Sequence, residues 1–237
     1  SATRLLQERI SKFVVPWGDP FVAVVERERA ILEKLAGLVL SQKSLPMTQR
    51  HALFALIGSG TPCFATRVNG DEQSMMRRLE THPNPILRSM SLRFHVDAGP
   101  MNPQSDFLTS AAEDKSPIVR LIAVSATNKV AITPEAKIAT LLLALSHNAD
   151  DKLIPRVAWQ NLHPHLEQHA SSFVAALKEG RFLQYEAVLG LMPRFVERIV
   201  GSQSTDAKPI AELIRLVRDD HPQVARDVLA VIAAKAQ

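Results

Sequence analysis

Apolar residues recur along the chain every three or four positions, the spacing that places them on one side of an α-helix. Short connections rich in Pro, Asp, Asn and Ser separate these segments. The pattern predicts helices over residues 20–42, 48–58, 72–82, 85–96, 104–113, 117–127, 134–147, 152–163, 168–179, 182–202, 207–219 and 222–235. Pro193 should kink or split the helix over 182–202. No segment alternates as a strand does, so the predicted fold class is all-α.

An aspartate and an arginine recur at the helix starts, six residues apart. The three copies are Asp114 with Arg120, Asp150 with Arg156, and Asp220 with Arg226. A fourth copy carries Arg88, with His82 in the place of the aspartate. The arginines are 32, 36 and 70 residues apart, and 70 is close to two repeats of about 35 residues. The chain is therefore predicted to consist of repeats.

This spacing is typical of HEAT repeats, helical hairpins with an aspartate in the turn and an arginine early in the second helix. Stacked hairpins align these turns, so each arginine can bridge carboxylates or carbonyls of its own and the neighbouring repeat. The predicted architecture is a HEAT-like α-α superhelix, a right-handed solenoid of about six hairpins forming one domain over residues 1–237. Trp159 and Leu229 both lie three residues after an arginine, on the predicted apolar stripe, so both are expected in the core.

Composition narrows the function classes only a little. An apolar fraction of 46% and only nine glycines in 237 residues agree with an ordered helical core. The net charge of +4 comes from scattered basic residues, which permits an anionic partner without indicating one. Cys63 is the single cysteine, which excludes an intrachain disulfide and a thiolate metal cluster. The sequence shows neither a secretory signal pattern nor an apolar run near the roughly 20 residues of a membrane helix.

His163, His165 and His169 form the strongest candidate metal site in the sequence. His165 and His169 have the i, i+4 spacing of zinc ligands on a helix. Pro164 is expected to break the helix between 163 and 168, and there is no HExxH motif, so a solvated turn is the preferred interpretation.

No other segment carries recognisable chemistry. The carboxylate pairs at 150–151 and 219–220 are interpreted as helix caps. The glycines near residue 60 match no phosphate-binding motif. We therefore assign no catalytic, cofactor-binding or metal-binding residue and expect no cofactor.

Three phrases resemble a known family: "ATRLLQER" at 2–9, "QRHALFALIGSG" at 49–60 and "IPRVAWQNLHPHLE" at 154–167. They look like the HEAT-repeat middle region of planctomycete-type proteins labelled as membrane-bound dehydrogenases or haem-binding CxxCH proteins. In that family the region lies between a β-propeller and a c-type cytochrome domain of an exported protein. This sequence has no CxxCH and no propeller repeat, so haem binding and dehydrogenase activity transfer to no residue here. The resemblance implies an excised, extracytoplasmic (periplasmic) linker domain.

The expected function is a non-catalytic scaffold or protein–protein interaction module whose partner is a protein or a neighbouring domain of the same chain. The alternative is a HEAT-like alkylpurine DNA glycosylase or another nucleic-acid-binding helical repeat protein. Such a glycosylase would need an aspartate, a tryptophan and several arginines converging on one face. Trp17 and Trp159 are far apart in sequence, and no aspartate can be placed beside either. The sequence therefore favours the scaffold.

Overall fold

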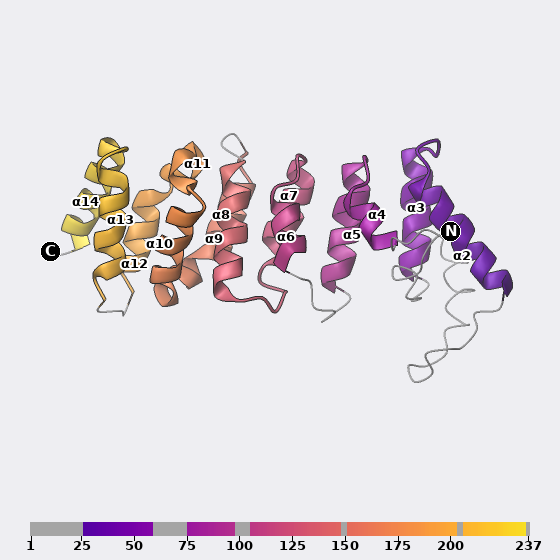
Figure 1. Cartoon of the computed structure of the whole chain (residues 1–237), viewed down its shortest axis with the longest axis horizontal. Coiled ribbons are helices and arrows are strands. Elements are labelled where there is room, and N and C mark those ends of the chain that lie inside the picture. The colour runs from indigo at the N-terminus through magenta and orange to yellow at the C-terminus, as the bar shows by residue number, and fades with distance from the viewer. Residues whose placement is uncertain (1–25, 59–74, 98–104, 148–150, 203–205, 236–237) are drawn as a thin grey trace. The chain divides into compact units, whose positions relative to one another are not determined.

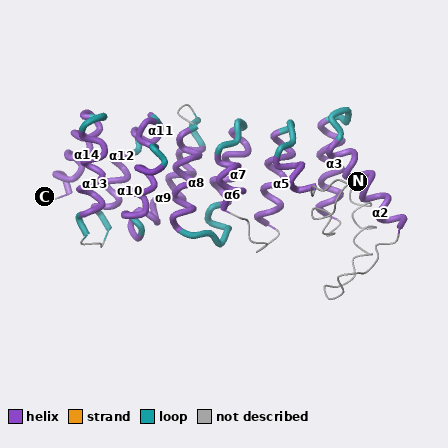
Figure 2. Tube along the Cα trace, viewed as in Figure 1, coloured by secondary structure: helices purple, strands orange, loops and turns teal. Residues whose placement is uncertain are grey.

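The computed structural model describes residues 26–58, 75–97, 105–147, 151–202 and 206–235, and within these ranges it contains helices and loops but no strand (Figures 1 and 2). The elements are α2 (Glu26–Leu40), α3 (Pro46–Gly58), α4 (Met75–Glu80), α5 (Pro85–Asp97), α6 (Ser105–Ala112), α7 (Pro117–Ala126), α8 (Pro134–Ser146), α9 (Ile154–Gln168), α10 (Ala170–Glu179), the 3-10 helix η2 (Phe182–Gln184), α11 (Glu186–Leu189), α12 (Met192–Val200), α13 (Lys208–Arg218) and α14 (Pro222–Lys235). The all-α prediction is confirmed. None of the described helices is long and apolar enough to cross a membrane.

Proline fixes many of the helix starts. A proline is the first residue of α3, α5, α7, α8 and α14, where its missing N–H would have no partner inside the helix. The predicted helix over 182–202 is split, and Pro193 is the second residue of its last part, α12. The prediction for this segment is confirmed.

Pro164 does not break its helix, contrary to the prediction. It lies inside α9, and the N–H of His169 still donates to the carbonyl of His165 at 2.7 Å. Leu162 and Leu166, on either side of the proline, are both fully buried. Burying two leucines contributes about 3–6 kcal/mol, enough to offset the roughly 3 kcal/mol that an interior proline costs.

The chain forms two compact units, residues 1–94 and 95–237. In the first unit, α2, α3 and α4 and the start of α5 share one apolar core. Its buried members are Ala36, Val39, Ala52, Leu53, Leu56, Met75, Leu79 and Leu87. A polar link joins the turns of this unit: Gln49 donates to the carbonyl of Ser41 at 2.9 Å and accepts from the side chain of Asn84 at 3.4 Å.

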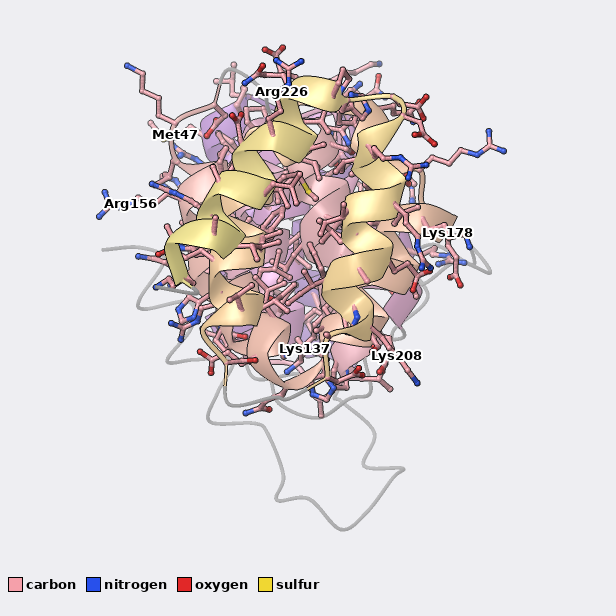
Figure 3. All side chains as sticks on the ribbon, turned by 90° about the vertical axis from the view of Figure 1, so that its left-hand side faces the viewer. Met47, Lys137, Arg156, Lys178, Lys208 and Arg226 are labelled. Atoms are coloured by element: carbon pink, nitrogen blue, oxygen red, sulfur yellow. The ribbon has the colours of Figure 1, made fainter. Side chains whose placement is uncertain are left out.

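The second unit is built in two helical layers. In one layer α8 contacts α6 and α10, and α10 contacts α13. In the other layer α9 contacts α7 and α12, and α12 contacts α14. The pairs α6–α7, α8–α9 and α13–α14 connect the layers, and Figure 3 shows α13 and α14 side by side at one end. Consecutive hairpins therefore stack against one another in this unit.

Asn161 of α9 fastens two neighbouring helices of one layer. Its side-chain amide donates to the carbonyl of Val124 at 2.7 Å, at the end of α7. Its oxygen accepts from the side chain of Asn128 at 2.8 Å. The Val124 carbonyl, at the end of α7, also accepts from the hydroxyl of Thr127 at 2.8 Å, so side chains replace the helical partner that it lacks. Asn161 thus fixes the position of α9 along α7.

Candidate interaction site

Two of the hairpin-turn arginines close the turn that precedes their own helix. Arg88 Nη1 donates to the carbonyls of His82 at 2.5 Å and Pro83 at 3.2 Å. Arg120 Nη1 donates to the carbonyl of Asp114 at 2.6 Å. The two arginines are only 7% and 8% exposed. A buried charge-assisted bond to the turn backbone makes both arginines structural.

Asp114 and His82, each six residues before one of these arginines, also form equivalent bonds: each accepts from the backbone N–H two residues later. Asp114 Oδ1 accepts from the backbone N–H of Ser116 at 2.7 Å. His82 Nδ1 accepts from the backbone N–H of Asn84 at 3.0 Å. Both bonds join residue i to residue i+2 and satisfy an N–H at a helix start. His82 therefore takes the place of the aspartate in its turn.

Arg156 and Arg226 behave differently. Both are exposed, and neither forms a hydrogen bond or an ion pair within the part of the chain that the structure describes. Asp150 lies outside the described residues, and Asp220 is exposed and makes no described contact with Arg226. The expected bridge is absent from the described contacts of Arg226, and for Arg156 the expected partner lies outside the described residues, so that prediction stays untested.

The reason is a shift of one residue in helical register. The first i to i−4 hydrogen bond of a helix marks its register, because its acceptor is the carbonyl of the residue just before the helix. In α5 the N–H donor of this bond belongs to Arg88, and in α7 it belongs to Arg120. In α9 it belongs to Val157, one residue after Arg156, and in α14 to Ala225, one residue before Arg226. One residue turns a side chain by about 100° around the helix axis, which points both arginines away from the turn.

The caps of α9 show the same shift. Asp151, not Asp150, accepts from the backbone N–H groups of Leu153 and Ile154, each at 2.8 Å. Asp219 does not cap α14 in this way, since its carboxylate binds the side chain of Arg218 at 2.7 Å. The paired carboxylates were predicted as caps, and only Asp151 is shown in that role.

Arg194 is an arginine of the same kind that sequence analysis missed. In α12 the first i to i−4 hydrogen bond is donated by the N–H of Phe195, one residue after Arg194. In α9 it is donated by Val157, one residue after Arg156, so the two arginines have the same register. It is exposed and, like Arg156, makes no described hydrogen bond or ion pair. The dipeptide Pro193–Arg194 repeats Pro155–Arg156 after 38 residues, which fills the long gap before Arg226. That dipeptide was the available signal.

The carboxylates on α9, α12 and α14 already have partners. Glu167 pairs with Arg198, and Glu197 pairs with Lys235 at 3.5 Å. Asp227 accepts from the side chain of Gln223 at 3.0 Å. In Figure 3, Arg156 projects from the side of the molecule opposite Lys178 of α10. The layer of α9, α12 and α14 thus presents arginines whose charge nothing described on these helices neutralises.

Trp159 is only partly buried, although the sequence predicted a core position. Its ring lies 5.9 Å from that of Phe195 and 6.0 Å from that of His163, measured between ring centres. The fully buried line of α9 is Ile154, Ala158, Leu162 and Leu166, spaced every four residues. Trp159 is one residue, about 100°, beyond that line, so one side of the indole stays accessible.

Leu229, at the same offset from Arg226, is 50% exposed rather than buried. The one-residue shift in α14 places Ala225 and Val228 on the buried side instead. The core assignment of Leu229 was wrong for the same reason as the role of Arg226.

The histidines near the end of α9 do not form a metal site in the described structure. The rings of His165 and His169 are 6.1 Å apart, and the described residues contain no group of three potential metal ligands. Burial, followed by the charges of Lys137 and His169, lowers the pKa of His165. His165 is thus favoured in its neutral form beside a cation. The glycines near residue 60 and Cys63 lie outside the described residues.

His82 should make the stability of the protein depend on pH. Burial, together with the charge of Arg88, lowers its pKa from the ordinary value of 6.5. The unfolded chain therefore binds the proton more readily, so stability is fully present above about pH 6.5 and falls as the pH drops through the folded-state pKa. We expect the midpoint temperature of thermal unfolding to be lower at pH 5.0 than at pH 7.5.

The variant His82→Asp is the matched control for this effect. It restores the aspartate of the other repeats, keeps an acceptor for Asn84, and stays ionised over this range. The fall in midpoint should be smaller in the variant than in the parent protein. An equal fall in both would assign the pH dependence to other groups, such as His165.

Comparison with protein-family models, with curated proteins and with solved structures found no match to this chain.

Proposed function

We propose that the chain is a non-catalytic HEAT-repeat scaffold, a superhelix of about six hairpins over residues 1–237 that binds proteins. The observation that carries the proposal is the repeated turn: Arg88 and Arg120 each donate to the backbone of the turn before their helix. The same i to i+2 cap precedes both. Repeat proteins stack hairpins that have equivalent turns, and the stack presents an extended surface to which a partner can bind.

The partner we propose is a neighbouring domain of the same gene product or a separate protein. The resemblance to the middle region of planctomycete-type dehydrogenase and CxxCH proteins supports a docking role inside a larger exported redox-type protein. The direct test is to express the full-length gene product and its separate domains. Elution of this chain together with a flanking domain in size-exclusion chromatography is expected. A gene product without propeller or CxxCH segments would remove the family resemblance.

One observation favours the glycosylase as a second candidate. Arg156 and the partly exposed Trp159 share α9, and Arg194 begins the neighbouring helix α12. Asp151, the aspartate of that turn, accepts from the backbone N–H groups of Leu153 and Ile154 and so acts as a helix cap, whereas the glycosylase requires an aspartate for catalysis. We expect no release of 7-methylguanine from methylated duplex DNA. Enzyme-dependent release that Trp159→Ala abolishes would replace the scaffold with an enzyme.

A further inference from the structure

We propose that Arg156 and Arg194 form one binding surface for an acidic, extended segment of a partner protein. The proposal rests on the scaffold function above and names the chemistry of the partner. Each arginine is the third residue of its helix, Arg156 in α9 and Arg194 in α12. Arg156 and Arg194 have the same register in α9 and α12, and these helices contact each other, so the two arginines stand at matching positions of neighbouring helices.

The spacing of the helices sets the spacing of the groups that can bind. Neighbouring packed helices lie about 8–10 Å apart, axis to axis. A chain in the polyproline II conformation advances about 3.1 Å per residue with three residues per turn, so three residues cover one helix-to-helix step and bring the side chain back to the same face. A carboxylate at every third residue of the partner would therefore meet successive arginines.

Charge complementarity identifies the bound groups as anionic. Glu167, Glu197 and Asp227, the acidic residues of α9, α12 and α14, are engaged with other side chains. Arg156 and Arg194 are exposed and lack such partners among the described residues. An incoming carboxylate gains charge-assisted bonds without displacing an existing ion pair.

The surroundings of the arginines favour a protein over a nucleic acid. A phosphate backbone carries a charge at every residue, so some phosphates would face the exposed carboxylates of Glu197, Asp220 and Asp227, whereas a peptide can place uncharged residues there. The partly exposed Trp159 and the half-exposed Leu229 offer apolar area to the residues between carboxylates. A peptide alternating acidic and apolar residues suits both features.

The test is fluorescence anisotropy with two labelled peptides of about a dozen residues and identical composition. One carries Glu at every third position with Leu and Ser between, and the other carries the same Glu residues in one block. We expect the spaced peptide to bind several times more tightly. The double variant Arg156→Glu, Arg194→Glu should weaken its binding about tenfold or more, because two attractions become repulsions.

Lys178→Glu with Lys208→Glu is the matched control. It changes the net charge equally, on exposed residues of α10 and α13 in the other layer. It should alter affinity less than about threefold. Circular dichroism and the thermal midpoint would show that each variant is folded. Should the glutamate pair unfold the protein, the neutral pair Arg156→Gln, Arg194→Gln makes the same test.

Three results would overturn this proposal. The first is that the arginine and lysine double variants weaken peptide binding equally. The second is that a DNA duplex binds more tightly than the spaced peptide and that this binding is lost in the Arg156 and Arg194 variants. The third is that the spaced peptide does not bind at low salt. Each is distinct from failure of the scaffold function, which would appear as base release from methylated DNA or as no complex with a flanking domain.

Discussion

Replacing Phe195 by alanine should lower the free energy of unfolding by about 3–5 kcal/mol, the cost of removing a fully buried aromatic ring. Phe195 belongs to α12 and has no exposed surface. Its ring meets that of Phe173 of α10 edge-on, with centres 4.9 Å apart, and lies 5.9 Å from that of Trp159 of α9. One ring therefore joins three helices from both layers, and its truncation would remove contacts with all of them.

Urea unfolding followed by circular dichroism gives the free energy, and Leu229→Ala is the control in the same unit. Leu229 is half exposed, so its truncation should cost less than about 1 kcal/mol. A second readout is the fluorescence of Trp159 in a Trp17→Phe background. Emission should shift to the red in Phe195→Ala, because the alanine uncovers part of the indole. Equal costs for Phe195→Ala and Leu229→Ala would show that the layers do not pack as described.

Helix positions were predictable because local chemistry fixes them. The starts of α5, α7, α8 and α14 coincide with prolines, which fit the first turn of a helix and interrupt the one before. Pro164 shows the limit of that rule. The same residue type ends a helix or lies within it depending on how much apolar surface is buried on both sides, and burial is a property of the fold rather than of the local sequence.

The roles of the arginines could be predicted only in part. Counting from an aspartate assumes that the aspartate fixes the helix start. In α9 two consecutive aspartates could cap, and the second one does. The resulting change of one residue separates a buried turn arginine such as Arg120 from an exposed one such as Arg156. Arg194 escaped the search because Val188 stands six residues before it, where the pattern required an acid.

Replacing Arg120 by alanine should lower the free energy of unfolding by about 1.5–3 kcal/mol, the contribution of a hydrogen bond to a charged group in a protected place. Arg120 is 8% exposed and donates to the carbonyl of Asp114 at 2.6 Å. Truncation removes that bond and leaves the turn before α7 without its buried donor. The turn also depends on the cap from Asp114 to Ser116, so both ends of the connection should loosen together.

Arg156→Ala is the comparison that separates the two kinds of arginine. It truncates the same side chain at the position that sequence spacing called equivalent, but its cost should stay within about 0.5 kcal/mol because the side chain is exposed and makes no described bond. Urea unfolding of the two variants side by side measures the difference. A loss of more than 1 kcal/mol in Arg156→Ala would mean that the arginine closes its turn and is not free to bind an acidic partner. Unchanged stability combined with weaker peptide binding is the result that the one-residue shift requires.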